Sequence, residues 1–171
     1  YHGPIVLPTQ ATGQDSVAMV VWDLAREYGV ARWVRVSADG GTTTLVERIE
    51  SEATPSVADV DGDGEPELIF RTPELRLVAT AMDGTMLWDV DGGEESDWGW
   101  PVVADLEGDG RLEIVETNRV YDAATGAFRF EVEGWWVQGY VQALVADLDL
   151  DGLAEIVLGE VVSTSAGTPL W

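Results

Sequence analysis

A nine-residue acidic stretch that occurs three times constrains this chain more than any other feature. Its first copy, Asp59–Glu67, places carboxylates at positions one, three, five and nine and a glycine at position six. The copies Asp105–Glu113 and Asp147–Glu155 begin 46 and 42 residues after the copy before them. We call these stretches the first, second and third loops. Recurrence at one period indicates repeated units that share one supersecondary structure.

A second marker recurs in phase with the three loops. Turn-forming dipeptides stand 41 to 44 residues apart at Asp39-Gly40, Asp83-Gly84, Thr125-Gly126 and Ala166-Gly167. Short apolar runs flank the turns and loops, and only Val17–Glu27 is compatible with a helix. A period in the low forties, made of short strands, is typical of a β-propeller blade. The sequence therefore predicts an all-β chain of blades with four antiparallel strands each.

The repeat phase divides the chain into about four blades, at residues 1–52, 53–98, 99–139 and 140–171. In the first, residues 8–16 align with the acidic loops but lack their carboxylates. Each blade is expected to have a strand before its loop, a strand after it and a hairpin about its turn dipeptide. The strand before the loop is almost continuously apolar, which predicts that it is the most buried.

The ends of the sequence suggest a larger assembly. The chain begins at Tyr1 rather than at methionine, and its last blade stops inside the fourth strand. A blade that ends within a strand leaves an edge to be paired. We therefore expect a piece of a longer protein, in which other blades or chains complete the ring.

The carboxylate spacing is that of oxygen ligands for a hard divalent cation. Side chains at positions one, three, five and nine, with the backbone carbonyl of position seven, can form an oxygen cage. An EF-hand is excluded because it needs flanking helices and a glutamate at position twelve. The remaining alternative is an acidic surface turn without metal. The predicted ligands are Asp59, Asp61, Asp63, Glu65, Glu67, Asp105, Glu107, Asp109, Arg111, Glu113, Asp147, Asp149, Asp151, Leu153 and Glu155.

These loops predict about three Ca²⁺ ions, one for each loop. The second loop is expected to bind most weakly, because Glu107 stands where the other two loops have aspartate. Without a cation, the clustered carboxylates of each loop would repel one another.

Ser56–Ile69 resembles the FG-GAP/VCBS repeat of integrin-α-like, calcium-binding β-propellers in its bacterial form, as do the other two copies. The resemblance implies structural Ca²⁺ on the face opposite the ligand surface. It implies ligand binding by the connections between blades, which are aromatic here. The candidate ligand-binding residues are Trp98, Trp100, Trp135, Trp136 and Tyr140. Packing between blades is their alternative role, and it is the preferred role for Trp88 and Trp171.

Composition narrows the possible partners and chemistry. The net charge of −23, with arginine as the only cationic residue besides His2, disfavours nucleic acids and anionic membranes as partners. No apolar run is as long as a membrane span. Cysteine is absent and His2 is the only histidine, so neither thiol chemistry nor a Ser/His/Asp site is expected.

We therefore expect a calcium-stabilised, non-catalytic module that is extracellular or displayed on the cell surface. It would act in adhesion or assembly by binding a protein or carbohydrate ligand. Two alternatives remain. One is the propeller of a polysaccharide lyase, because rhamnogalacturonan lyases carry similar aspartate-rich loops, and the other is a lectin that uses the tryptophan-rich connections.

Overall fold

The computed structural model describes residues 17–22, 30–36, 39–50, 54–93, 100–134 and 142–170. Every regular element in these ranges is a β-strand, and they include no helix that could cross a membrane. The strands are β1 (Val17–Trp22), β2 (Val30–Val36), β3 (Thr42–Glu50), β4 (Ser56–Ala58), β5 (Glu67–Arg71), β6 (Arg76–Ala81), β7 (Met86–Asp91), β8 (Val102–Ala104), β9 (Glu113–Glu116), β10 (Arg119–Asp122), β11 (Phe128–Glu131), β12 (Leu144–Ala146), β13 (Glu155–Leu158) and β14 (Val161–Ser163).

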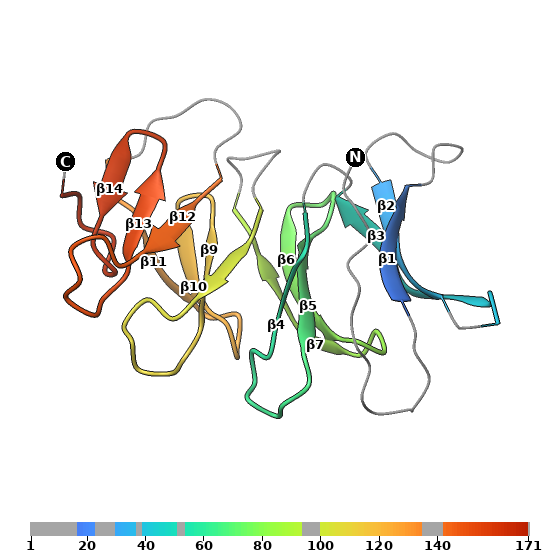
Figure 1. Ribbon diagram of the computed structural model, residues 1–171. Helices are drawn as coiled ribbons and strands as arrows, with labels where there is room; N and C mark the ends of the chain where they lie inside the picture. Colours follow the sequence, from blue (N-terminus) through green and yellow to red (C-terminus); the bar gives the residue numbers. More distant parts are fainter. Residues whose placement is uncertain are drawn as a thin grey trace.

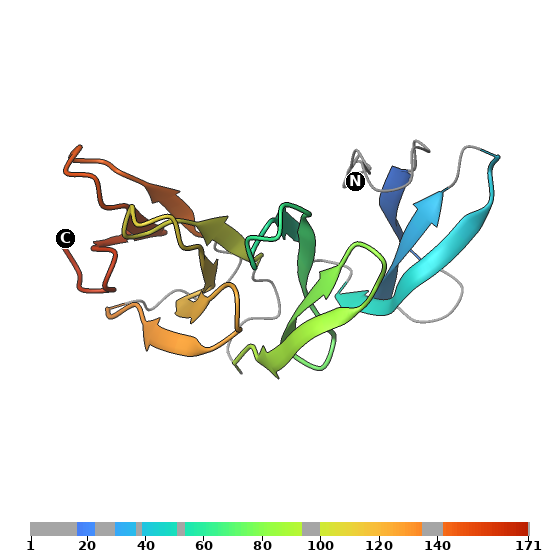
Figure 2. The same cartoon turned by 90° about the horizontal axis from the view of Figure 1, so that it is seen from below.

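The strands form four antiparallel sheets in which neighbours in sequence are neighbours in the sheet: β1–β3, β4–β7, β8–β11 and β12–β14. Figures 1 and 2 show the sheets side by side in chain order, from the blue β1–β3 sheet to the red β12–β14 sheet. Opening strands of successive sheets lie together, β4 beside β8 and β8 beside β12. The predicted all-β, antiparallel architecture is confirmed. The described residues do not close into a ring.

The four predicted turn dipeptides all contain a left-handed glycine. The φ angles of Gly40, Gly84, Gly126 and Gly167 are 82°, 90°, 71° and 81°. A Cβ added to Gly126 would lie 2.8 Å from the Trp88 ring of the preceding sheet, and one added to Gly167 would lie 2.7 Å from the Phe130 ring. Trp88 and Phe130 occupy the same position in their repeats. The turns at Gly126 and Gly167 therefore each pack on an aromatic residue of the sheet before them.

The core lies between the sheets rather than within one of them. Strand alternation sends Ile114 of β9 to the cluster shared with the β4–β7 sheet and Val115 to the cluster shared with the β12–β14 sheet. Tyr121 and Val120 of β10 divide in the same way. Because both faces of these strands are covered, both sets of side chains are apolar.

The strand that follows each loop is the most buried, which corrects the expectation that the preceding strand would be. All residues of β5 and β9 are buried, whereas β4 and β8 are half-buried along their length. The reason is position in the sheet. β5 and β9 have a hydrogen-bonded strand on both sides, while β4 and β8 are the edges of their sheets.

Candidate metal centre

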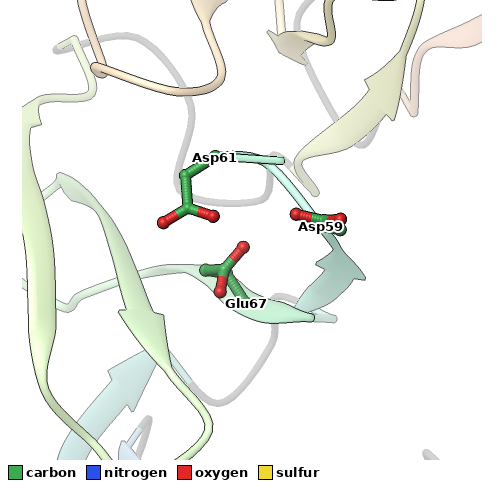
Figure 3. Close-up of side chains that lie close together, drawn as sticks. All are labelled: Asp59, Asp61 and Glu67. Atoms are coloured by element: carbon green, nitrogen blue, oxygen red, sulfur yellow. The ribbon is translucent and has the colours of Figure 1, made fainter. Parts of the chain in front are cut away.

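The first loop connects β4 to β5 and gathers three carboxylates. Glu67, the first residue of β5, is only 2% exposed, and its Oε2 accepts a hydrogen bond from the Val60 N–H at 2.9 Å. Asp59 accepts from the Gly64 N–H at 3.0 Å. Figure 3 shows Asp59, Asp61 and Glu67 around a common space, and oxygens from the three lie within 4.8 Å of one another. We call these residues the first trio.

The third loop, between β12 and β13, repeats this arrangement. Glu155 accepts from the Leu148 N–H at 2.8 Å, and Asp147 accepts from the Gly152 N–H at 3.0 Å. One oxygen each from Asp147, Asp149 and Glu155, the third-loop trio, again lies within 4.8 Å of the others. The first and third loops, which have the same spacing, therefore each form a carboxylate cluster from positions one, three and nine.

A left-handed residue at position four as well as at position six shapes every loop. Position six is Gly64, Gly110 and Gly152, with φ of 92°, 87° and 94°. Position four is Gly62, Gly108 and Leu150, with φ of 79°, 66° and 65°. The glycine at position six was predicted from the spacing, whereas the left-handed residue at position four was not. The two glycines at position four were the signal, and Leu150 concealed it in the third loop.

The second loop keeps the backbone pattern but not the carboxylate trio. Asp105 accepts from the Gly110 N–H at 2.8 Å, and Glu113 accepts from the Leu106 N–H at 3.0 Å. Here Arg129 of β11 enters the loop. Its Nη2 donates to Glu107 at 2.6 Å, and its Nη1 donates to Glu113 at 2.6 Å and to Glu107 at 3.1 Å. Among the described residues, only the first and third loops bring three carboxylates together as a candidate metal site.

In every loop, the aspartate at position five is hydrogen-bonded to the backbone of position seven. Asp63, Asp109 and Asp151 each accept a hydrogen bond from the backbone N–H two residues later, at 2.8, 2.9 and 2.8 Å. Those N–H groups belong to position seven, which is Glu65, Arg111 and Leu153. The predicted coordination by the carbonyls of position seven remains a prediction.

Burial and backbone hydrogen bonds shift the pKa values of three loop carboxylates, Glu67, Glu113 and Asp105. Burial raises the pKa of Glu67. The hydrogen bond from the Val60 N–H partly opposes this rise, and repulsion from Asp61, Asp63 and Asp59 increases it. Burial also raises the pKa of Glu113, while backbone hydrogen bonds, first that of Gly110, lower the pKa of Asp105. A cation within the first loop would relieve this repulsion.

Only one of the predicted aromatic ligand residues falls within the described residues. Trp100 is half-buried and lies two residues before the start of β8. Trp98, Trp135, Trp136 and Tyr140 lie outside the described residues, as do Trp171 and the predicted vestigial loop at residues 8–16. Trp88 is buried and donates from Nε1 to the Ala123 carbonyl of the next sheet at 3.0 Å, which confirms its predicted role in packing.

Comparison with known proteins gives two curated relatives from Bacillus subtilis (strain 168). Rhamnogalacturonan exolyase YesX is 29% identical over a 146-residue alignment, gaps included, that covers 65% of this chain and 24% of that protein. Rhamnogalacturonan endolyase YesW is 35% identical over a 94-residue alignment, gaps included, that covers 44% of this chain and 15% of that protein. Both relatives are rhamnogalacturonan lyases. The chain spans a quarter of their length or less.

Solved structures share the fold. The V. cholerae biofilm matrix protein Bap1 matches 97% of this chain and 29% of its own with a TM-score of 0.74 and 18% identity. Rhamnogalacturonan lyase YesW matches 92% of this chain and 28% of its own with a TM-score of 0.61 and 22% identity. The Bacillus licheniformis rhamnogalacturonan lyase matches 91% and 28%, with a TM-score of 0.58 and 23% identity. At such identities the likeness concerns the fold alone.

The comparisons correct the family expected from the loops. No model of a known protein family matches the chain, and the relatives are lyases, so the assignment to FG-GAP/VCBS repeats and the associated role in cell adhesion were wrong. The physical reason is that the geometry of a nine-residue oxygen loop between two strands depends only on residues within the loop. Such a motif indicates the chemistry of the loop, not the ancestry of the chain.

The expectation of a non-catalytic module is also contradicted, because the matching relatives are enzymes. That expectation used the lack of a histidine beyond His2. A chain that spans 24% or less of these enzymes need not contain their acid and base groups. The lack of one side chain in such a segment therefore excludes no activity.

Proposed function

We propose that this chain is the calcium-binding part of a polysaccharide lyase that cleaves an acidic polysaccharide of the rhamnogalacturonan class. The observation that carries the proposal is the sequence similarity to two rhamnogalacturonan lyases, one of which matches 65% of the chain. The activity belongs to a whole protein of which this chain would form one part. The shared fold of the solved lyases supports the same assignment.

The first trio and the third-loop trio would each hold a Ca²⁺ ion. Carboxylate oxygens within 4.8 Å of one another suit a hard cation that prefers oxygen ligands. The bound ion would neutralise the clustered charge and tie each loop to the strand that follows it. Because Glu67 and Glu155 are buried at the start of those strands, the role of the ion is structural.

Four arginines of the described residues are engaged in ion pairs within the fold. Arg71, Arg76, Arg119 and Arg129 each pair with a carboxylate of this chain. Positive charge for uronate groups would therefore come from residues beyond these four. Trp98, Trp100, Trp135, Trp136 and Tyr140 remain candidates for stacking on sugar rings.

The four sheets would be successive blades of a larger β-propeller, with bounds at residues 1–52, 53–98, 99–139 and 140–171. The in-order antiparallel sheets and the adjacent opening strands β4, β8 and β12 support this arrangement. We place the protein outside the cell, where such polysaccharides occur and where a biofilm matrix protein of the same fold acts. A structure of the full polypeptide with no further sheet beside β12–β14 would contradict the ring.

The lyase assignment is tested with the full polypeptide that the gene encodes, purified and supplied with Ca²⁺. On rhamnogalacturonan, the ultraviolet absorbance of unsaturated uronate ends should increase with time, and it should not on an uncharged polysaccharide such as galactan. Removal of Ca²⁺ should reduce the increase, because the metal-free protein is less stable. If folded, Ca²⁺-loaded protein leaves rhamnogalacturonan intact, the lyase assignment is wrong.

A further inference from the structure

The repeat that contains the second loop differs from the repeats of the other two loops at two positions. These positions are far apart in sequence and meet in the structure. At position three it has Glu107, where the first and third loops have Asp61 and Asp149. The second difference is Arg129, which is 22 residues away from Glu107 and forms two hydrogen bonds to its carboxylate. The longer glutamate and the arginine are therefore one paired change.

Arg129 occupies a position that is leucine in the two repeats that contain the first and third loops. Between β10 and β11, Tyr121 pairs with Phe128 and Val120 pairs with Phe130, so Arg129 is the extra residue of a β-bulge. Between β6 and β7, Ala79 pairs with Trp88 and Thr80 pairs with Met86, which leaves Leu87 in the same bulge. The turn glycines Gly84, Gly126 and Gly167 align Leu87 with Arg129 and with Leu170.

The guanidinium of Arg129 lies among the carboxylates that would otherwise hold a metal ion. It bridges position three, Glu107, and position nine, Glu113, whose equivalents Asp61 and Glu67 belong to the first trio. Glu113 is 1% exposed and would be a buried, unbalanced charge without a cation. A guanidinium carries a permanent charge and matches two carboxylates with parallel N–H groups.

We propose that Arg129 is the built-in cation of the second loop, so that this chain binds two Ca²⁺ ions rather than three. This inference rests on the proposed calcium sites of the first and third loops. The guanidinium satisfies Glu107 and Glu113, and a metal ion would have to displace both ion pairs to enter. The second loop is thereby tied to β11 of its own sheet without dependence on calcium.

The test measures the number of Ca²⁺ ions bound, by calorimetric titration of the metal-free chain with calcium chloride. Wild type should bind two ions, and Arg129→Leu, which introduces the residue found in the repeats of the first and third loops, should bind three. Arg76→Leu is the matched control, because it removes an exposed arginine that pairs with Asp89 away from the loops, and it should bind two. A wild-type count of three would overturn the inference while the calcium sites stand.

A second pair of variants keeps the test valid if Arg129→Leu does not fold. Glu107→Gln and Asp61→Asn change equivalent, solvent-accessible carboxylates. Glu107→Gln should leave the count at two, whereas Asp61→Asn should lower it by one. A count lowered by Glu107→Gln would show metal in the second loop and overturn the inference.

The two proposals can fail separately. No binding by wild type together with one ion bound by Arg129→Leu would refute the calcium sites of the first and third loops and support the role of Arg129. No binding by either protein would refute both.

Discussion

The Arg71 Nη1 donates to the Glu116 Oε1 at 2.8 Å across the boundary between two sheets, and the two side chains are 2% and 0% exposed. Arg71 is the last residue of β5, and Glu116 is the last residue of β9. The Arg71 Nη2 also donates to the Gly93 carbonyl at 3.0 Å. This buried ion pair joins the sheets at the ends of their most buried strands.

Replacement of Glu116 by glutamine should destabilise the fold. The guanidinium of Arg71 would remain buried without its counter-charge, at a cost of about 3 kcal/mol in the free energy of unfolding. Asp89→Asn is the control, because it breaks the exposed pair between Arg76 and Asp89, and it should cost less than about 1 kcal/mol. Urea unfolding of both variants would measure the difference. Equal midpoints for the two variants would argue against a stabilising role for the buried pair.

Removal of Ca²⁺ should lower the melting temperature. An ion that binds only the folded state stabilises it by about 2.7 kcal/mol per site when its concentration is a hundred times the Kd. Melting curves recorded by circular dichroism with Ca²⁺ and with excess chelator would detect the shift, and restored Ca²⁺ should reverse it. Superimposable curves would refute the calcium sites.

Acidification should stabilise the metal-free protein through Glu67. The folded-state pKa of Glu67 is raised above 4.5 by burial and by its acidic neighbours. A raised folded-state pKa gives a stability contribution that is present at low pH and is lost as pH rises through that pKa. Between pH 7 and pH 4.5, wild type should therefore gain stability relative to Glu67→Gln.

Urea midpoints of the metal-free proteins at several pH values would measure this gain. At pH 7 the metal-free wild type should be less stable than metal-free Glu67→Gln. With Ca²⁺ present at the same pH, wild type should be the more stable of the two, because only its carboxylate can bind the ion. Parallel pH curves for the two metal-free proteins would be evidence that Glu67 is not in a repulsive, buried setting.

Truncation of Trp88 should be costly because its ring is part of the core between two sheets. Trp88→Ala should lower the free energy of unfolding by about 3–5 kcal/mol. Trp88→Phe retains a ring but loses the Nε1–H bond to Ala123, which corresponds to about 1 kcal/mol. Met86→Ala, at a 59% exposed position of the same strand, is the control and should have little effect. Denaturant titration would rank the three, and a small loss in Trp88→Ala would place the ring outside the core.

Much of the local structure was predictable from sequence. Glu67–Arg71 was recognisable as a strand after a loop, and β5 has those bounds. The turn glycines were recognisable because a left-handed residue without a Cβ is a local requirement. The convergence of the first trio follows from the spacing of Asp59, Asp61 and Glu67 within one loop, which needs no distant contact.

Tertiary structure alone decided which loop is already neutralised and which strand is buried. Arg129 meets Glu107 through the fold of a four-stranded sheet, and Arg71 meets Glu116 across two sheets. Burial of β5 rather than β4 follows from sheet neighbours and not from its composition. The sequence by itself determined the repeat, its turns and its acidic loops, since short-range geometry controls these. Pairing over long separations in sequence decided which charges are balanced, because that depends on the chain as a whole.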